Sequence, residues 1–337
     1  MHGFVAGLMR LAYGIPPLRF FIRKMFVVKH PVLTRDFCGL KFSNPVGLAA
    51  GFDKNAKLFR AFSTLGFSFI EIGTVTPKAQ SGNSKPRLFR VVPDSALINR
   101  MGFNNRGVDA AVKQLKRKRP NVVIGGNIGK NTATSNNDAP VDYLECFRKL
   151  YPFVDYFTVN VSCPNVAHLS ELQNVHSLTK ILTAVLDERD RQKFRKPVLV
   201  KVSPDLSFSQ IDDILDIAEK MGVDGIVAIN TTTTRNHLTI DKEQIAHFGN
   251  GGLSGKPLTQ KAIETIKHIR QHTAGKMPVM GVGGIMTAND AMNMLNAGAT
   301  LIQVYTGFIY EGPAIVKKIN KAILKKEKIR KNPVLFH

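Results

Sequence analysis

The sequence of 337 residues is poor in cysteine, and its three cysteines stand far apart at positions 38, 146 and 163. An odd, sparse set gives no disulfide framework and indicates a reducing compartment. No spacing of cysteine and histidine matches a zinc site. His268 and His272 lie four residues apart on an expected helix. We interpret them as a solvated basic face without a carboxylate partner, and we predict no metal site.

Acidic residues are also scarce, because 25 Asp and Glu stand against 47 Lys and Arg, a formal net charge of +22. This imbalance favours an anionic partner, and the candidate classes are nucleic acid, an acidic lipid surface and anionic metabolites. Residues 1–30 contain five basic residues and no acid. A second basic cluster at residues 317–331 contains one acid, Glu327, and is expected to form a solvated final helix and tail.

Long hydrophobic runs are missing, so no segment is expected to cross a bilayer. Residues 1–30 instead carry two apolar stripes at helical spacing, with Pro16 and Pro17 between them. The stripes are Phe4, Leu8, Leu11, Ala12 and Ile15, followed by Leu18, Phe21, Ile22 and Met25. Two short amphipathic helices bordered by Arg and Lys fit a segment in the membrane interface, although helices that only cap a larger domain would carry the same pattern. A signal peptide does not match, because no clean apolar region leads to a cleavage site.

From residue 45 onward, short β-rich runs alternate with segments of helical spacing. The runs lie at residues 46–50, 69–73, 122–128, 156–161, 197–202, 225–229, 278–282 and 301–305. Near-continuous apolar strands separated by helices indicate a parallel sheet that is buried on both faces. Eight such units close an α/β (β/α)8 TIM barrel, which we place at residues 38–330. An open doubly wound sheet is disfavoured, since no G-x-G-x-x-G motif follows the first run.

Polar residues gather at the expected carboxyl ends of these strands, the edge at which TIM barrels build active sites. They are Lys54, Thr74, Asn127, Asn160, Lys201, Asn230, Gly284 and Tyr305. Asparagine and glycine are also common turn formers, but that explanation is hard to sustain for all eight strands at once. Two lysines at inward positions predict an anionic ligand or an electron-rich ring between them. The many amides suit a planar heterocycle rich in carbonyl and N–H groups.

Glycine-rich turns follow the last two strands, as Gly281-Val-Gly-Gly284-Ile285 and Tyr305-Thr306-Gly307. Backbone N–H groups in such turns can approach a phosphate, and barrels that hold phosphorylated cofactors use this position. The segment Gly252-Leu-Ser-Gly255-Lys256 has the wrong spacing for a nucleotide triphosphate loop. We expect it to be a third loop near the phosphate.

The segment Asn160-Val-Ser-Cys163-Pro-Asn165 ends the fourth strand. A cysteine on a rim loop can act as a nucleophile or as a proton acceptor, provided that a nearby lysine lowers the pKa of the thiol. The alternative is a small, buried apolar thiol. The position on the rim favours the chemical role.

These motifs together resemble the dihydroorotate dehydrogenase family, in order along residues 38–320. The segments that carry the resemblance include Asn44 to Lys54, Glu71 to Pro77, Lys85 to Arg90, Asn99 to Asn105, Asn127 to Asn131, Asn160 to Asn165, Lys201 to Asp205 and Gly251 to Gly255. The stretch Asn-Arg-Met-Gly-Phe-Asn-Asn at 99–105 and the N-terminal extension resemble the quinone-dependent class. The resemblance implies oxidation of (S)-dihydroorotate to orotate in pyrimidine biosynthesis.

The resemblance also implies residue roles. FMN would contact Ala50, Gly51, Thr74, Asn127, Asn160, Lys201, Gly255, Gly284, Tyr305 and Thr306. Dihydroorotate would contact Lys54, Asn99, Arg100, Met101, Gly102, Phe103, Asn160, Asn165, Asn230 and Thr231. Cys163 would take a proton from C5 while hydride leaves C6 for the flavin. Residues 1–30 would admit a membrane quinone that reoxidises the flavin, on the cytoplasmic side of a bacterial inner membrane, in peripheral contact with its anionic surface.

Three positions differ from the pattern of the quinone class. Cys163 stands where that class usually has serine, as in the soluble classes, and Ile229 stands where threonine is frequent. The N-terminal segment is shorter than in most members, which implies an abbreviated quinone tunnel or an upstream start. The alternatives are therefore a soluble-class enzyme that uses fumarate or NAD, supported by Cys163, and an RNA-binding flavin reductase of the tRNA-dihydrouridine synthase type, supported by the net charge. The amide-rich rim favours a small anionic pyrimidine, and we expect no nucleic acid partner.

Overall fold

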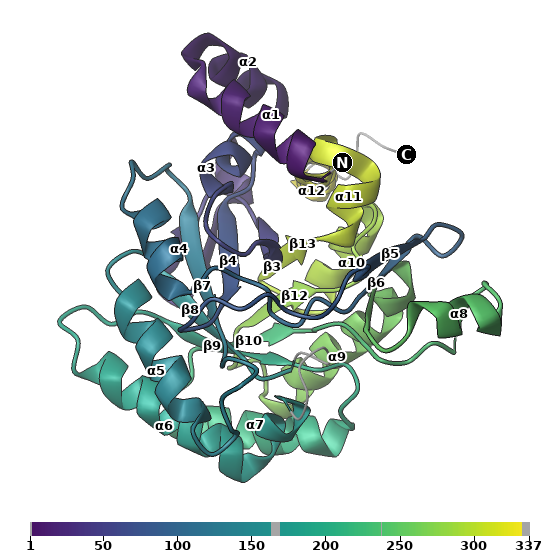
Figure 1. The fold of residues 1–337 in the computed structure, drawn as a ribbon. Helices are drawn as coiled ribbons and strands as arrows, with labels where there is room; N and C mark the ends of the chain where they lie inside the picture. Colours follow the sequence, from purple (N-terminus) through teal and green to yellow (C-terminus); the bar gives the residue numbers. More distant parts are fainter. Residues whose placement is uncertain (1, 163–168, 237, 332–337) are drawn as a thin grey trace.

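The computed structural model describes residues 2–162, 169–236 and 238–331. Eight parallel strands close into a barrel in the order β10-β12-β13-β3-β4-β7-β8-β9, which confirms the predicted TIM barrel (Figure 1). The strands are β3 (Val46–Asp53), β4 (Phe69–Val75), β7 (Val123–Ile128), β8 (Tyr156–Asn160), β9 (Val198–Val202), β10 (Gly225–Ala228), β12 (Val279–Val282) and β13 (Leu301–Val304). Each predicted run overlaps one of them, and β3 and β4 continue past their runs to Asp53 and Val75. The barrel closes where β13 pairs with β3, with Ile302 opposite Val46.

Helices surround the barrel and bury their apolar faces against it. They are α3 (Phe59–Phe62), α4 (Val108–Leu115), α5 (Ala139–Leu150), α6 (Val175–Asp190), α7 (Phe208–Met221), α9 (Thr259–His272), α10 (Ala288–Asn296), α11 (Thr306–Glu311) and α12 (Ile315–Lys331). Helix α7 shows why the sequence forms them. Ser207 and Gln210 make a capping box at its start, and Gly222 ends it at a φ of +74°.

The face of α9 at His268 and His272 is not the unpaired basic surface that the sequence suggested. Nε2 of His268 lies 2.6 Å from Oδ1 of Asp212, and Nε2 of His272 lies 2.8 Å from Oδ1 of Asp216. Both aspartates belong to α7, more than fifty positions earlier in the chain. The interpretation was wrong because the carboxylates reach the histidines only through the packing of two neighbouring helices.

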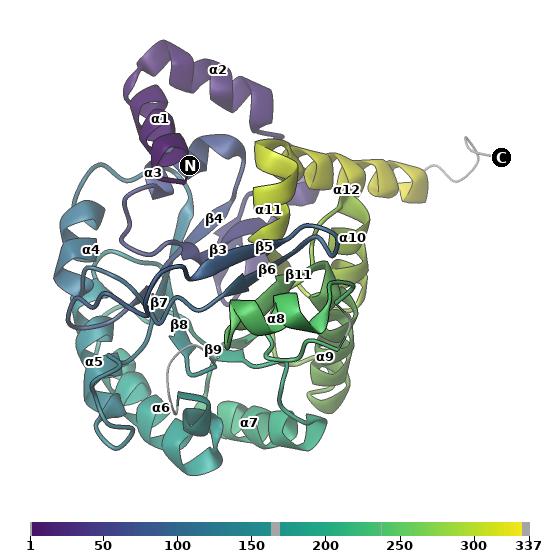
Figure 2. The same ribbon diagram turned by 45° about the vertical axis from the view of Figure 1, so that its right-hand side comes forward.

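A three-stranded antiparallel sheet lies over the carboxyl end of the barrel (Figure 2). Its strands are β5 (Leu88–Val91), β6 (Ala96–Asn99) and β11 (Gly252–Gly255), and helix α8 (Lys242–Phe248) lies beside it. The segment from Gly252 to Gly255 is thus a strand and not the loop that was expected, because Gly252 pairs with Asn99 and Gly255 with Ala96.

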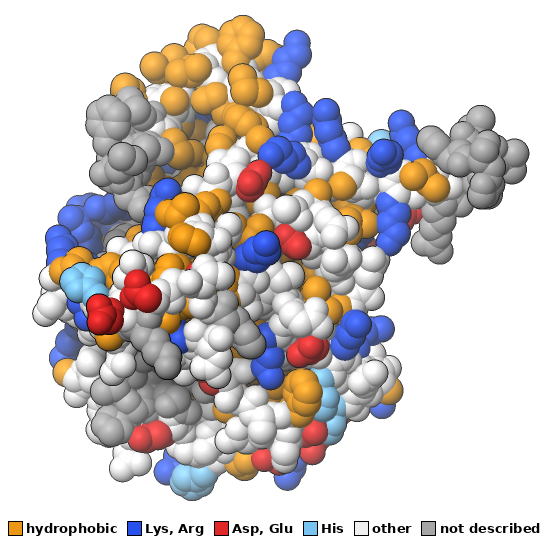
Figure 3. Space-filling model, turned by 90° about the vertical axis from the view of Figure 1, so that its right-hand side faces the viewer, with side chains coloured by type: hydrophobic (Ala, Val, Ile, Leu, Met, Phe, Trp, Pro, Cys, Tyr) orange, Lys and Arg blue, Asp and Glu red, His pale blue; other side chains and the backbone are white. Residues whose placement is uncertain are grey.

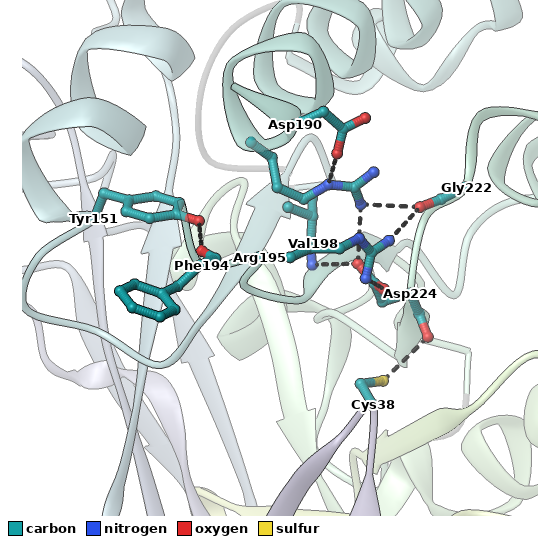
Figure 4. Close-up of polar contacts among 9 residues, drawn as sticks. Cys38, Tyr151, Asp190, Phe194, Arg195, Val198, Gly222 and Asp224 are labelled. Atoms are coloured by element: carbon teal, nitrogen blue, oxygen red, sulfur yellow. Dashed lines mark hydrogen bonds and ion pairs between the residues drawn. The ribbon is translucent and has the colours of Figure 1, made fainter. Parts of the chain in front are cut away.

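A short hairpin of β1 (Arg35–Phe37) and β2 (Leu40–Phe42) lies at the amino end of the barrel, where Phe37 and Phe42 pack into the barrel core. Its two turn residues, Cys38 and Gly39, have φ values of +50° and +77°, as in a type I′ turn. Sγ of Cys38 donates a hydrogen bond to the backbone oxygen of Asp224 (Figure 4). Burial raises the pKa of this thiol to about 12, so Cys38 is a structural residue.

Two helices precede the barrel, α1 (His2–Gly14) and α2 (Pro16–Phe26), in agreement with the two predicted amphipathic helices. Pro16 begins α2, since proline is tolerated in a first helical turn. Both helices lie outside the barrel, beside α3 and near α12 (Figures 1 and 2). Within the described ranges, no helix is both long and apolar enough to span a membrane.

Candidate active site

A pocket opens at the carboxyl ends of the barrel strands and has an empty volume of about 960 Å³, its mouth included. Nine of the residues expected at the cofactor line it: Ala50, Gly51, Thr74, Asn160, Lys201, Gly255, Gly284, Tyr305 and Thr306. Residues expected at the substrate line it too, namely Lys54, Asn99, Met101, Phe103, Asn160, Asn230 and Thr231. Among its described lining residues there are two lysines and no carboxylate, so the pocket favours an anionic ligand.

The floor of the pocket is a chain of hydrogen bonds between the ends of neighbouring strands. Nδ2 of Asn160 donates to Oγ1 of Thr74 at 2.9 Å, and this hydroxyl donates to Oδ1 of Asn127 at 2.5 Å. Asn127 is fully buried behind these two residues and does not line the pocket. Its own Nδ2 donates to Oε1 of Glu71 at 2.7 Å inside the barrel. Buried amides that are satisfied in this way are fixed in orientation.

Lys54 is held at the rim by the turn that follows β3. The carboxylate of Asp53 accepts the backbone N–H groups of Lys57, Leu58 and Phe59 at 2.7–2.8 Å. Burial raises the pKa of Asp53, and these hydrogen bonds oppose the shift. Nζ of Lys54 donates to Oδ1 of Asn104 at 2.7 Å. The turn therefore fixes the backbone next to Lys54, and Asn104 fixes its ammonium group.

Only some of the residues expected from the loop at 99–105 line the pocket. Asn99, Met101 and Phe103 line it, whereas Arg100 and Gly102 do not. The guanidinium of Arg100 is directed to the backbone oxygen of Pro86, with donor distances of 3.0 and 3.1 Å. Arg100 is thereby turned out of the pocket, and Gly102 has no side chain to offer it.

The glycine turns border the pocket as expected. A Cβ at Gly284, whose φ is +71°, would fall 2.3 Å from Oγ1 of Thr259. A Cβ at Gly255, whose φ is +105°, would fall 2.4 Å from the backbone oxygen of Ser95. Both positions, one in a turn and one at the end of β11, thus require glycine for close packing of the backbone at the pocket wall. Nearby, the hydroxyls of Ser254 and Thr306 lie 2.9 Å apart.

Cys163 and Asn165, the expected proton acceptor and a substrate contact, lie outside the described residues. Ser162, which precedes them, is buried, and its hydroxyl accepts a hydrogen bond from Nδ2 of Asn230 at 2.9 Å. The start of this loop is thereby tied to a residue that lines the pocket.

The sequence reasoning missed two polar pocket residues, Gln303 and Ser254. Gln303 is buried, and its Oε1 has no hydrogen-bond partner among the described residues. The two-residue repeat of strands was a usable signal, since Gln303 shares one face of the final strand with Leu301, and Tyr305 follows two positions later. Ser254 was harder to find, because its strand was taken for a loop.

Comparisons with known proteins agree on one family. The family model described as dihydroorotate dehydrogenase matches residues 32–326. The chain is 49% identical to the dihydroorotate dehydrogenase (quinone) of Christiangramia forsetii, over 97% of this chain and 94% of that one. It is 46% identical to the protein of the same name from Rhodococcus erythropolis, over 97% and 90% of the two chains.

Solved structures give the same result. The crystal structure of a ligand-free DHODH from Eimeria tenella aligns with a TM-score of 0.84 at 34% identity, covering 97% of this chain and 96% of that chain. The structure of the Eimeria tenella DHODH in complex with ferulenol aligns with a TM-score of 0.82 at 35% identity, covering 95% and 92%.

Proposed function

The chain belongs to the dihydroorotate dehydrogenase family, and from that premise we propose that it oxidises (S)-dihydroorotate to orotate in pyrimidine biosynthesis and passes the electrons to a membrane quinone. The supporting observation is a lysine- and amide-lined pocket in a chain whose relatives are named for the quinone-dependent enzyme. These names do not favour the soluble-class alternative or the RNA-binding flavin reductase.

FMN is the flavin that we propose for the pocket. Gln303 offers a buried acceptor atom that a ligand donor can satisfy, and Lys201 brings a cation to a wall without carboxylates among its described residues. Glycine at the end of β11, Gly255, and in the turn at Gly284 leaves the pocket wall without a side chain at these two positions, so backbone N–H groups can approach a phosphate there. FMN would be held by these two glycines and by Ala50, Gly51, Thr74, Asn160, Lys201, Tyr305 and Thr306, with Asn127 supporting Thr74 from behind.

When bound, FMN supplies a two-electron acceptor for the hydride of dihydroorotate. The residues of the chain bind and orient the substrate. Lys54 offers its charge to the carboxylate of dihydroorotate, and the amides of Asn99 and Asn230 match its ring carbonyl and N–H groups. Phe103 adds an apolar ring to the lining of the pocket.

Cys163 is the proposed proton acceptor for C5 of dihydroorotate. A thiol is intrinsically more acidic than the serine hydroxyl that the quinone class usually has there, so a larger fraction is ionised near neutral pH. Asn230 holds Ser162, the residue before it, at the rim. This contact keeps the start of the loop beside the bound substrate.

The N-terminal segment of residues 1–30 is the proposed entry for the quinone and the site of membrane association. Its exposed apolar side chains include Leu11, Phe20, Phe21 and Met25, which are 57–65% exposed. We refer to α1 and α2 as the apolar cap, and Figure 3 shows hydrophobic side chains gathered on it with Lys and Arg along its edge. Such a surface fits peripheral insertion into the cytoplasmic face of a bacterial inner membrane. The barrel at 38–330 would then carry the flavin chemistry.

A single-acceptor assay tests the proposed function. Purified protein is mixed with dihydroorotate and either a short-chain quinone, fumarate or NAD, and orotate formation is followed by its absorbance. We expect turnover with quinone, and we expect the Cys163→Ala variant to serve as the inactive control. Turnover with fumarate or NAD alone would contradict the quinone assignment, and no turnover with any acceptor would contradict the proposed substrate.

A further inference from the structure

Helix α12 separates an apolar face from a row of lysines. Val316, Ile319 and Ile323 are buried against the rest of the molecule. Lys321, Lys325 and Lys328 are exposed and recur at intervals of four and three residues, so they lie along one side of the helix. We call these three residues the lysine row. The sequence alone suggested only a solvated helix here.

The neighbours of α12 define the direction of the lysine row. Nζ of Lys317 donates to the backbone oxygen of Met25, at the end of α2, at 2.6 Å. Nζ of Lys326 donates to Oδ1 of Asn296, at the end of α10, at 2.7 Å. At 100° per residue, the lysine row lies opposite the buried face and borders the edge marked by Lys317. It therefore continues outward from the base of the apolar cap, where Figure 2 shows α12 leaving the barrel.

The acidic residues of this region do not neutralise the lysine row. Glu327 is half-buried, and its charge interacts with Arg35. Burial lowers the pKa of the Arg35 guanidinium, and the carboxylate of Glu327 partly opposes that shift. Glu311 forms its ion pair with Lys318, at 2.9 Å. Within the described part of the chain, no ion pair involves a member of the lysine row. Three like charges on one exposed edge favour an anionic surface as partner.

We propose that the lysine row binds the headgroups of anionic phospholipids and forms a second contact with the membrane beside the apolar cap. The inference rests on the proposed membrane association of that cap. The apolar cap with its own Arg and Lys already favours anionic lipid, but a single contact leaves the tilt of the barrel free. A second charged edge continuous with the cap adds to the selectivity for anionic lipid and fixes the tilt. Surface charges act over about 8 Å at physiological salt, so they act only when the cap is inserted.

The test compares binding to phosphatidylcholine vesicles with and without phosphatidylglycerol, by co-sedimentation of the flavin-loaded protein. The variant Lys321→Gln, Lys325→Gln, Lys328→Gln removes the row and keeps side chains of similar length on the helix. The control variant Lys180→Gln, Lys220→Gln, Lys267→Gln removes the same charge from exposed sites on α6, α7 and α9, away from the cap. We expect the row variant to lose about tenfold or more in partition onto the anionic vesicles. We expect both variants to bind neutral vesicles like the wild type.

Three outcomes would overturn the inference. Equal losses for the row variant and the control variant would show that only net charge matters. Binding of the row variant at the wild-type level to anionic vesicles would leave the apolar cap as the whole membrane contact. Failure of the wild type to bind any vesicle would overturn the membrane association itself, while reduction of a soluble quinone in the same samples would show that the proposed activity stands.

Discussion

Nε2 of Gln303 donates a hydrogen bond to Oε2 of Glu71 at 2.7 Å, across 232 positions of the sequence. The same carboxylate accepts Nδ2 of Asn127 at 2.7 Å and the hydroxyl of Tyr156 at 3.0 Å. Because a carboxylate can only accept, both amides must turn their oxygens away from it. Asn127 therefore offers its oxygen to Thr74, and Gln303 leaves its oxygen to the pocket.

Replacement of Glu71 by glutamine should disturb the hydrogen bonds that orient Asn127 and Gln303 beneath the pocket. The new amide group places an N–H where three donors already point, so at least one buried donor loses its acceptor. We expect the free energy of unfolding to fall by about 2–4 kcal/mol and the bound flavin to be depleted. Denaturant unfolding and the flavin absorbance of the purified protein measure the two effects. The control Glu243→Gln changes an exposed residue on α8 and should leave both unchanged. A Glu71→Gln protein with wild-type stability and flavin content would refute the role of this carboxylate.

Replacement of Cys163 should separate acid–base chemistry from binding. We expect Cys163→Ala to lose about 100-fold or more in kcat with little change in KM, and Cys163→Ser to retain part of the activity. Because the reacting form is the thiolate, wild-type activity should rise toward alkaline pH, and the serine variant should need a higher pH still. The control Cys38→Ala removes a thiol at the opposite end of the barrel and should not alter kcat. A fully active Cys163→Ala enzyme would contradict the assigned proton acceptor.

Replacement of Gly284 by alanine should deplete the flavin, because the added Cβ would fall 2.4 Å from the backbone N of Thr259. The residue also has a positive φ, which is strained for alanine wherever it occurs. Gly222→Ala is the matched control, since its φ is +74° and no atom lies within 4 Å of the added Cβ. We expect the control to lose about 1 kcal/mol of stability and to keep its flavin. If both variants purify with the same flavin content, the close contact between Gly284 and Thr259 is not needed for flavin binding.

His272 should make the stability of the protein depend on pH. Its hydrogen bond with Asp216 raises the pKa of its ring, although burial acts in the opposite direction. The proton is therefore bound more tightly in the folded chain. The resulting stabilisation is complete below the ordinary pKa of about 6.5 and is lost as the pH rises through the raised value. We expect the difference in Tm between wild type and His272→Gln to shrink as the pH rises from about 6.5 through the raised pKa of His272. The exposed residue His176 on α6 provides the control variant, and an identical pH profile for both variants would disprove the coupling.

The barrel could be predicted because its strands are buried on both faces. A run such as Val198–Val202 is apolar at nearly every position, so its pattern survives without knowledge of its neighbours. The strands of the additional sheet could not be predicted in this way. Ala96–Asn99 and Gly252–Gly255 have four residues each, and Gly252–Gly255 is a strand only because it pairs with Ala96–Asn99, with Gly252 opposite Asn99 across 153 positions. Short antiparallel pairs of this kind leave no period in the sequence.

The pocket could be predicted in part for a similar reason. Lys54, Asn160 and Lys201 lie at strand ends, and the barrel brings all strand ends to one rim. The orientation of Arg100 away from the pocket depends on the backbone oxygen of Pro86, a contact that spacing does not encode. The aspartate partners of His268 and His272 are likewise set by the packing of α7 against α9.

The pairing of β3 with β13 has a consequence for the order of synthesis. The first barrel strand, β3, completes its pairing only with the last, β13. The barrel therefore cannot close until Val304 has left the ribosome. At about 5–20 residues per second, α1 and α2 will have emerged roughly 15–60 seconds earlier. Their partner contact at Lys317 is made later still. A nascent chain therefore exposes its apolar cap for that interval before its own barrel exists, and the proposed contact with lipid is open to the cap during folding as well as in the finished protein.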